Sequence, residues 1–480
     1  MELINHLIVI DRDNKMPVYR QISHCVITAI KNGNLRRGEQ LPGTRELGAM
    51  LGVHRKTVIA AYEELASQDW ISVSPKKRVT ISERIPVLRG SEWSASVDHK
   101  SNFSTFSLPL KHFEAGEPRF EQSTQSQIVI DDGYPDMRLS PVDSLLKTYR
   151  AYTKRGYAVR NATIGNAQGT DQLRTALASY LSGTRGLQID KDNLLITHGA
   201  QMSIYLASRV LLDSTATVVV GRLNYAPANK CFEAEGAHVI EIGVDEKGMM
   251  VDELEAICRR TNITAVYVIP HHHYPTTVTL SVERRVQLME LARLYSFAII
   301  EDDYDFDYHY TAPPYLPLAG SGHDGNIIYI GSVSKILGPS IRMGFMVAPK
   351  NFIESCTSLR KLVDVSNDIY LQNALADLLK SGELVRHVKK AKKIYQQRME
   401  FLDALLKKHL SGLVSYKLPT GGMALWVKLS PACPIDKLIS HQMIHIKHFD
   451  VDENAFRLGF ASSDFEQLQE IVIALKAAIE

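Results

Sequence analysis

The residues best suited to covalent chemistry gather at Ser332-Val333-Ser334-Lys335, directly after an apolar run at 327–330 that predicts a buried strand. A lysine in the loop at the end of such a strand can form a Schiff base with an aldehyde cofactor. The hydroxyls of Ser332 and Ser334 and the guanidinium of Arg342 suit a phosphate dianion. Alone, this pattern also fits a surface lysine in a serine-rich loop.

A second group of reactive side chains, Glu301-Asp302-Asp303-Tyr304, closes another apolar run upstream. A carboxylate at the end of a buried strand, such as Asp302, can pair with a protonated pyridine nitrogen and keep the ring an electron sink. Tyr304 can donate a hydrogen bond to the phenolic oxygen of such a ring. Taken alone, this stretch also fits an ordinary acidic loop.

Two further features suit the same cofactor. Gly199-Ala200-Gln201 lies between an apolar run and an apolar helix, and a helix N-terminus offers backbone N–H groups to a phosphate. Tyr225 follows the run at 217–220, where a flat aromatic ring can stack on a pyridine; a core tyrosine is the alternative. Three consecutive histidines, His271–His273, point alternately along an extended chain and chelate poorly, so no metal site is predicted.

The elements that must position these residues alternate in type from about residue 126 onward. Short apolar runs separated by helical stretches are typical of parallel strands buried on both faces, at Leu194–Ile196, Thr217–Val220, Ala265–Ile269, Phe297–Ile300 and Ile327–Ile330. From about residue 385, helices surround a strand-like Met423–Leu429. The sequence therefore predicts a large three-layer α/β domain over 126–480 with a smaller C-terminal α+β subdomain.

The N-terminal region, residues 1–85, has a different pattern. Helices are expected from Pro17 to near Gly33, from a Thr44 cap to Gly52, and from His54, followed by a hairpin of 71–73 and 79–81. This order is that of a winged helix-turn-helix; a small helical cap on an enzyme is the alternative. Base edges or phosphates of double-stranded DNA would then meet basic and polar positions of the helices and the wing tip, namely Arg45, Arg55, Lys56, Thr57, Lys76, Lys77 and Arg78.

The bulk properties limit what the chain can be. The chain of 480 residues is too long to fold around one hydrophobic core, so more than one domain is expected. A serine-rich stretch at 86–125 indicates a linker between domains. The five cysteines lie far apart and show neither zinc nor redox spacing. No signal peptide is evident, and no apolar stretch approaches the roughly 20 residues that span a bilayer. We therefore expect a cytoplasmic protein without a membrane segment.

Both halves resemble known families. Residues Leu41-Pro42-x-x-Arg45-x-Leu47, Leu51-Gly52-Val53-x-Arg55-x-Thr57-Val58 and Ala61-Tyr62-x-x-Leu65 resemble the GntR winged-helix regulators. The order of Gly199–Gln201, Tyr225, Asp302, Tyr304, Lys335, Arg342 and Arg457 resembles the fold-type I pyridoxal-phosphate enzymes of the aspartate aminotransferase superfamily.

The second resemblance implies a role for each site residue. Lys335 would carry pyridoxal 5'-phosphate as an internal aldimine, Asp302 would pair with the ring nitrogen, Tyr304 would contact the phenolic oxygen, and Tyr225 would stack on the ring. Phosphate contacts would come from Ser332, Ser334, Arg342 and the backbone of Ala200 and Gln201. Arg457 would hold a ligand carboxylate, and His272 or Tyr274 would contact the ring or the ligand.

The fusion of these two halves resembles the MocR, or GabR-like, regulators. That resemblance implies a head-to-tail homodimer that binds promoter DNA and senses pyridoxal phosphate, or an amino-acid or amine effector, with the aminotransferase-like domain used for sensing rather than turnover. A catalytically competent aminotransferase with an accessory DNA-binding domain is the alternative. Pro227 stands where GabR-like members carry an arginine, so one anchor for a ligand carboxylate is missing.

Overall fold

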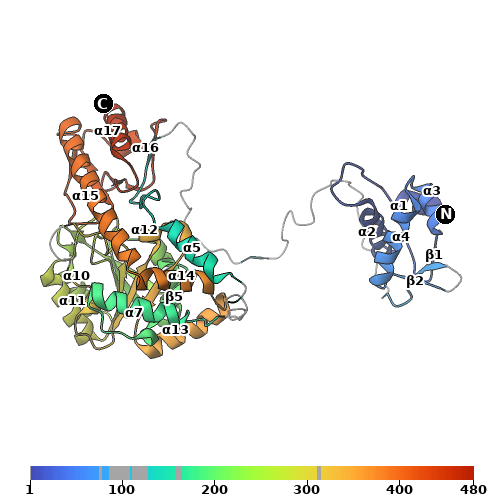
Figure 1. The fold of residues 1–480 in the computed structure, drawn as a ribbon, viewed down its shortest axis with the longest axis horizontal. Helices are drawn as coiled ribbons and strands as arrows, with labels where there is room; N and C mark the ends of the chain where they lie inside the picture. The colour runs from blue at the N-terminus through green and yellow to red at the C-terminus, as the bar shows by residue number, and fades with distance from the viewer. Residues whose placement is uncertain are drawn as a thin grey trace. The chain divides into compact units, whose positions relative to one another are not determined.

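The structure is a computed structural model that describes residues 2–74, 78–85, 109–110, 128–154, 156, 165–310, 315–366 and 368–479. It divides into two compact units, residues 1–110 and 111–480 (Figure 1). Two wing-tip residues, Lys76 and Lys77, and the expected linker apart from residues 109–110 lie outside the described residues. None of the helices in these ranges is long and apolar enough to cross a membrane.

Unit 1 is a winged helix-turn-helix, as the sequence predicts. Its helices are α1 (Glu2–Leu7), α2 (Val18–Lys31), α3 (Thr44–Met50) and α4 (Arg55–Ser67). The wing strands β2 (Ile71–Val73) and β3 (Val79–Ile81) pair antiparallel, and β1 (Gln40–Leu41) joins them in the order β1-β3-β2. A core that includes Ile22, Leu47, Val58 and Leu65 packs the helices together.

The caps of α3 and α4 differ from each other. The expected Thr44 cap is wrong, because Gly43 occupies the N-cap of α3 and Thr44 is already helical. The short hydroxyl of Thr44 instead accepts a hydrogen bond from Arg55 Nε at 3.3 Å. At α4, His54 Nδ1 accepts from the Lys56 amide at 3.2 Å and so satisfies one of the free N–H groups of the first turn.

The main sheet of unit 2 has seven strands in the order β5-β13-β12-β11-β10-β6-β7. Their bounds are β5 (Leu194–Thr197), β6 (Thr217–Gly221), β7 (His238–Ile242), β10 (Ala265–Val268), β11 (Ala298–Asp303), β12 (Ile327–Ser332) and β13 (Gly344–Val347). All five predicted strands are present. Strand β13 runs antiparallel to both of its neighbours, β12 and β5, which the sequence pattern did not indicate.

Helices cover both faces of this sheet, because successive side chains of a buried strand point to opposite faces. Val218 and Val220 pack against α8 (Ala200–Leu211), α9 (Ala226–Ala234) and α13 (Lys350–Val363), whereas Val219 packs against α10 (Val251–Cys258) and α11 (Val282–Tyr295). Helices α5 (Val142–Tyr152), α7 (Asp171–Arg185) and α14 (Ile369–Lys380) cover β5 and β13 on the second face. This is the three-layer arrangement that the sequence predicts.

The smaller subdomain contains a four-stranded sheet of order β14-β15-β18-β17, made of β14 (Val414–Tyr416), β15 (Ala424–Leu429), β17 (Phe449–Asp450) and β18 (Ala455–Gly459). Helix α15 (Glu383–His409) leads to α16 (Ile435–Ile439) and α17 (Phe465–Ile479) at one end of unit 2 (Figure 1). Strand β4 (Ile128–Ile130) pairs with β16 (Ile444–Ile446) and buries Ile130 in this subdomain's core. Short elements complete the unit: β8 (Val244–Asp245), β9 (Gly248–Met249), α12 (Ser334–Leu337) and three 3-10 turns at Lys191–Asn193, Leu318–Gly320 and Pro339–Ile341.

Asp136 ties the chain that follows β4 to α15. Its carboxylate accepts from Arg398 Nη2 at 2.9 Å and from Arg138 Nε at 2.9 Å, while its amide donates to the Tyr395 hydroxyl at 2.9 Å. The Arg398 side chain is buried, whereas the Arg138 side chain is half exposed. The ion pair between Asp136 and Arg398 is therefore shielded from water, whereas the pair between Asp136 and Arg138 is not.

We expect Asp136→Ala to lower the free energy of unfolding of unit 2 by about 3–5 kcal/mol, because it leaves the buried Arg398 without its carboxylate. The exposed partner is the matched control: Arg138→Ala should cost no more than about 1 kcal/mol. Urea unfolding of the full chain, followed through the unfolding transition of unit 2, measures both. Equal losses for the two variants would contradict this account of the pair.

Candidate functional site

Lys335 lies in α12, directly after the carboxyl end of β12. Its Nζ donates to the Gly133 carbonyl at 2.8 Å and lies 5.2 Å and 5.6 Å from the ring centroids of Tyr134 and Tyr304. Burial lowers the pKa of Lys335, and nearby Asp132 opposes that shift. A lowered pKa increases the neutral fraction of the amine, which is the nucleophilic form.

Asp302 is buried near the end of β11. Its Oδ2 accepts from the Tyr267 hydroxyl at 2.7 Å, whereas its buried Oδ1 has no hydrogen-bond partner among the described residues. Burial raises the pKa of Asp302 to about 7, with Tyr267 acting against that shift and Asp303 adding to it. A buried carboxylate with an unused oxygen fits a protonated ring nitrogen, and this observation supports the expected cofactor.

Arg342 lies against the N-terminus of α8, where the sequence predicts contacts to a phosphate. Arg342 Nη2 donates to the His198 carbonyl at 2.9 Å, and a Cβ placed on Gly199 would lie 3.1 Å from that same nitrogen. Gly199 precedes α8 with a φ of 102°, which favours glycine, so the helix presents its first free N–H groups beside a guanidinium. A Cβ on Gly344 would lie 2.6 Å from the Gly199 carbonyl carbon, so β13 approaches this turn backbone to backbone.

The predicted serines lie at a strand end and a helix start: Ser332 ends β12, where it pairs with Gly344 of β13, and Ser334 begins α12. Ser332 Oγ accepts from the Ser334 amide at 3.1 Å, while the buried Ser334 Oγ lacks a hydrogen-bond partner within the described ranges. The Gln201 side chain turns away: its Nε2 donates to the Pro227 carbonyl at 3.2 Å and to Cys231 Sγ at 3.3 Å. The side-chain amide is therefore engaged elsewhere, and contact between the Gln201 backbone and a phosphate stays a prediction.

The tyrosines of the site contact one another and Arg457. Tyr225 occupies the N-cap position of α9, and its ring meets Tyr274 edge to face at a centroid distance of 6.0 Å. The Tyr304 hydroxyl donates to the His272 carbonyl at 2.9 Å and accepts from Arg457 Nη2 at 3.1 Å. In this structure the Tyr304 proton is therefore directed to the backbone and not to an open face of the site.

Arg457 comes from β18 of the smaller subdomain and is buried. Its Nε donates to the Asp132 carbonyl at 2.6 Å and its Nη1 to the Pro275 carbonyl at 2.7 Å. Its guanidinium carbon lies 4.9 Å from the centroid of the Tyr274 ring. With the bond to Tyr304, each of its three side-chain nitrogens donates to a protein oxygen.

Two contact residues were missed at the sequence level, Asp132 and Gly133. They lie just after β4, about 200 residues from Lys335 in the chain, and Gly133 reaches Lys335 through its backbone carbonyl. A backbone contact of this kind leaves no trace in side-chain type or spacing. The pair Asp131-Asp132 before a glycine was the available hint.

The three histidines point to different partners. His271 Nε2 contacts the Tyr315 carbonyl at 2.7 Å, His272 Nδ1 contacts Asp305 Oδ1 at 2.9 Å, and His273 Nδ1 contacts Thr276 Oγ1 at 2.8 Å. The part of the chain that the structure describes contains no group of three or more side chains able to hold a metal ion. Burial lowers the pKa of His273 to about 3, so this ring is neutral.

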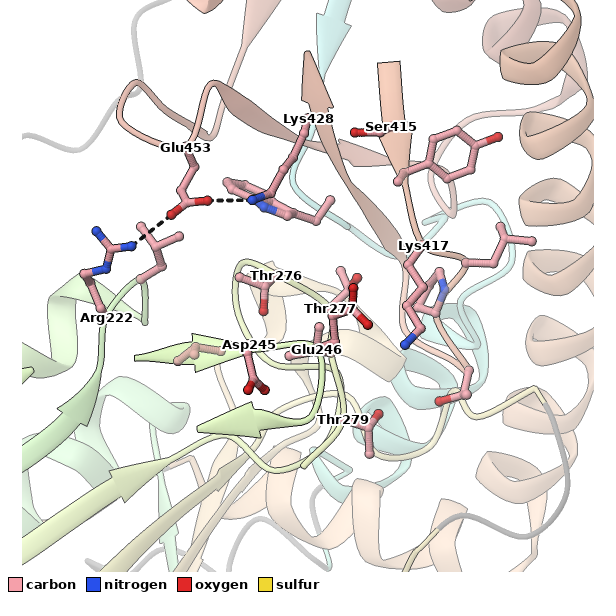
Figure 2. Close-up of a pocket in the computed structure, with 18 residues that line it drawn as sticks. Arg222, Asp245, Glu246, Thr276, Thr277, Thr279, Ser415, Lys417, Lys428 and Glu453 are labelled. Atoms are coloured by element: carbon pink, nitrogen blue, oxygen red, sulfur yellow. Dashed lines mark hydrogen bonds and ion pairs between the residues drawn. The ribbon is translucent and has the colours of Figure 1, made fainter. Parts of the chain in front are cut away.

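A pocket of about 590 Å³ lies beside this site and not within it. It opens between the 276–279 loop and β14–β15, and Figure 2 shows Arg222, Glu453 and Lys428 joined across its upper edge. Glu453 Oε1 lies 3.0 Å from Arg222 Nη2, and Glu453 Oε2 lies 2.6 Å from Lys428 Nζ. None of the residues predicted to bind the cofactor lines this pocket.

The residues predicted to bind DNA occupy exposed positions of unit 1. Arg45 on α3, Arg55 and Lys56 on α4 and Arg78 at the edge of the wing are exposed, and Thr57 is half-buried. The bond from Arg55 Nε to Thr44 Oγ1 joins the start of α4 to the start of α3. These positions leave positive charge free for phosphates or base edges.

Comparison with protein families matches both units. Residues 134–475 match the family described as aminotransferase class I and II, and residues 18–81 match the family described as bacterial regulatory proteins, gntR family. The first match covers most of unit 2 and contains Lys335, Asp302, Arg342 and Arg457. The second contains α2, α3, α4 and the wing.

Individual proteins are similar over nearly the whole chain. The probable rhizopine catabolism regulatory protein MocR of Rhizobium meliloti is 24% identical over 98% of this chain and 96% of its own length. The HTH-type transcriptional regulator TauR of Rhodobacter capsulatus is 28% identical over 87% of this chain and 85% of its own. Among solved structures, Pyrococcus horikoshii kynurenine aminotransferase, in complex with PMP, aligns with a TM-score of 0.68, 26% identity and coverage of 74% of this chain and 91% of that one.

The neighbouring carboxylates Asp302 and Asp303 should affect stability in opposite directions. The pKa of Asp302 is raised to about 7, so its contribution to stability is present below its usual pKa of about 3.9 and is lost as the pH rises through 7. In the cofactor-free protein, Asp302→Asn should therefore raise the free energy of unfolding at pH 8 by about 2–4 kcal/mol and change it little near pH 4.

Asp303 is the matched control. Burial raises its pKa, but His271, Arg185 and Tyr329 outweigh burial and hold the pKa below its usual range. Its stabilising contribution is thus present above that range, and Asp303→Asn should destabilise the protein at pH 8. Urea unfolding at both pH values measures the two variants. If Asp302→Asn destabilised the protein at pH 8, the ionised Asp302 carboxylate would not be unfavourable in the folded state, and this account would be wrong.

Proposed function

Because the chain belongs to the aminotransferase class I and II family and carries a GntR-family DNA-binding domain at residues 18–81, we propose that it is a transcription regulator that binds pyridoxal 5'-phosphate and an amine or amino-acid effector. The observation that carries the proposal is that one chain combines an exposed basic helix start in unit 1 with a buried lysine site in unit 2. The similarity to MocR over 98% of the chain supports it, because that relative is named a regulatory protein.

The residues present fit the cofactor. Arg342, Ser332, Ser334 and the backbone of Ala200 and Gln201 would hold its phosphate, and Asp302 would hold its ring nitrogen. The buried Asp302 Oδ1 and Ser334 Oγ, each without a protein partner among the described residues, support this assignment. When bound, the group supplies an aldehyde for Lys335 and a ring that withdraws electrons. Tyr225 would cover that ring.

The chain's own hydrogen bonds suggest how occupancy could be sensed. Lys335 Nζ donates to the Gly133 carbonyl and Arg457 Nε to the Asp132 carbonyl, so both residues hold the same turn. A lysine amine that reacts, or a ligand that engages Arg457, competes with these bonds. In sequence the turn follows the stretch that connects the two units, and we propose that its release changes how unit 1 binds DNA.

A working aminotransferase is the second candidate, favoured because the chain carries Lys335, Asp302 and Arg457 together. Full turnover of an amino acid with a keto acid would support it, whereas a half-reaction alone would favour sensing. The proposal includes a cytoplasmic head-to-tail homodimer, which the resemblance to the MocR regulators implies. Sedimentation of the cofactor-loaded protein tests the oligomeric state.

Lys335→Ala should abolish the visible absorbance that a lysine-bound pyridoxal phosphate gives, because it removes the amine that follows the carboxyl end of β12. The exposed Lys361 on α13 provides the control, and Lys361→Ala should keep the band. Absorbance spectra of the full chain after incubation with the cofactor measure this. A persistent band in Lys335→Ala would place the cofactor on another lysine.

Arg55→Ala should weaken binding to DNA upstream of the protein's own gene by about 1–3 kcal/mol, because Arg55 stands at the exposed start of α4. Arg20→Ala is the control: this exposed arginine on α2 pairs with Glu64 at 3.6 Å and lies outside the predicted DNA-binding set. Fluorescence anisotropy with labelled DNA, at one stated salt concentration, measures both affinities. Equal losses in the two variants would contradict recognition by α4.

A further inference from the structure

Lys447 is a half-buried lysine directly after β16. Because β16 pairs with β4, the Lys447 amide donates to the Ile130 carbonyl at 3.0 Å, which places this residue beside the segment that follows β4. Its Nζ lies 4.8 Å from the centroid of the Tyr134 ring, and Lys335 Nζ lies 5.2 Å from the same centroid. A second amine therefore lies close to the lysine that is expected to carry the cofactor.

His448, the next residue, connects Lys447 to Arg457. The His448 carbonyl accepts from the Arg457 amide at 2.9 Å, and His448 Nδ1 lies 3.0 Å from the Tyr274 hydroxyl. The guanidinium carbon of Arg457 lies 4.9 Å from the centroid of the Tyr274 ring. Arg457 and Lys447 therefore border the same part of the site, on neighbouring segments of the smaller subdomain.

Among the described residues, the Lys447 amine has a tyrosine ring beside it and no carboxylate within ion-pair distance. The carboxylates of this region already have partners, namely Asp131 with the Gly133 and Tyr134 amides at 2.7 Å and 3.0 Å and with the Ser462 hydroxyl, Asp132 with the Tyr274 hydroxyl at 3.1 Å, and Asp305 with His272 at 2.9 Å. Burial, together with Asp132 and Asp131, raises the pKa of Tyr134 to about 12, so the Tyr134 hydroxyl is neutral and does not balance the charge of Lys447. A carboxylate from a ligand can therefore take this place.

The charge of Asp132 acts on the other two cations of the site. Burial raises the pKa of Asp132, but the charges of Lys335 and Arg457 and the bond from Tyr274 hold it below its usual value. Arg457 is expected to bind a ligand carboxylate, and a guanidinium has five N–H donors. The bonds described above use one donor on each nitrogen, so both Nη atoms keep a donor for that carboxylate. Lys447 is then available for a second one.

We propose that Lys447 is a specificity-determining residue that pairs with a second carboxylate of the ligand, so that the site selects an amino acid with an acidic side chain. The inference rests on the proposed function, in which Lys335 carries pyridoxal phosphate, and it keeps the expected role of Arg457. The lysine side chain has a flexible four-carbon stem, so its ammonium can turn from the Tyr134 ring to a carboxylate. A hydrogen bond to an ionised group is roughly twice as strong as a neutral one, which favours an acid over its amide.

Recognition then uses three groups of the ligand. Its amine takes the place of the Lys335 amine on the cofactor's aldehyde carbon: one C–N bond forms, another breaks, and two protons of the ligand ammonium end on the Lys335 amine, without oxidation or reduction. The first carboxylate meets Arg457 and the second meets Lys447. An uncharged side chain of the same length reaches the same place but leaves the Lys447 ammonium without a counter-ion.

Two pairs of amino acids test this directly, L-glutamate with L-glutamine and L-aspartate with L-asparagine, because the members of each pair differ in charge and hardly in size. The full-length protein, loaded with pyridoxal phosphate, is titrated with each amino acid while the visible absorbance is followed. We expect at least one acid to bind about tenfold more tightly than its amide. If neither acid binds more tightly than its amide, the inference is overturned.

Lys447→Gln removes the charge and keeps a polar side chain. For the acid that the wild type prefers, this variant should lose about tenfold in affinity, while a nearly unchanged affinity for the amide shows that the site is intact. Lys447→Arg keeps the charge and should keep the preference. Lys417→Gln is the matched control and should also keep it, because this exposed lysine lines the neighbouring pocket (Figure 2). A preference for the acid that survives in Lys447→Gln would contradict the assignment.

The two levels of the proposal fail differently. If the wild-type protein shows no visible absorbance with pyridoxal phosphate, the proposed cofactor is wrong. If the absorbance is present and neither acid is favoured over its amide, the cofactor assignment stands and the proposed role of Lys447 is wrong.

Discussion

Two hydrogen bonds to consecutive carbonyls organise the site: Lys335 Nζ to Gly133 and Arg457 Nε to Asp132. Lys335 follows β12 of the main sheet, Arg457 belongs to β18 of the smaller subdomain, and the turn follows β4, which pairs with β16. Three segments far apart in sequence therefore meet at one turn. Because both donors are basic side chains in a buried place, their positions depend on that turn and on the carboxylate of Asp132.

The three buried carboxylates at the end of β11 differ in how completely they are hydrogen-bonded. Buried Glu301 accepts from the Leu318 amide at 2.8 Å and the Ala319 amide at 2.9 Å, and Asp303 accepts from the Tyr329 hydroxyl at 2.8 Å. Asp302, between them, has one oxygen bonded to Tyr267 and one without a partner among the described residues. An incompletely satisfied buried carboxylate is unfavourable in the empty protein, and a cationic ring nitrogen would remove that penalty.

Local patterns predicted much of this molecule. The order of helices and wing strands in unit 1, the five apolar strands and the motif around Lys335 all follow from residue types within short windows. The pairing of β13 with β5, the pairing of β4 with β16 and the contact between Gly133 and Lys335 join segments more than a hundred residues apart, which no window contains. The predicted cap of α3 was wrong by one residue. Gly43 provides the extended backbone that precedes the helix, and the hydroxyl of Thr44 accepts a hydrogen bond from Arg55 instead.

The central claim is that occupancy of the Lys335 site and DNA binding by unit 1 are coupled, and coupling between two ligands is reciprocal. The direct measurement is the affinity of the cofactor-loaded, full-length protein for an amine or amino acid that changes its visible absorbance, with and without saturating DNA from upstream of its own gene. The account predicts affinities that differ by roughly 5–150-fold, with the same factor in the DNA affinity when the amine is varied. Identical amine affinities in the presence and absence of DNA would contradict it.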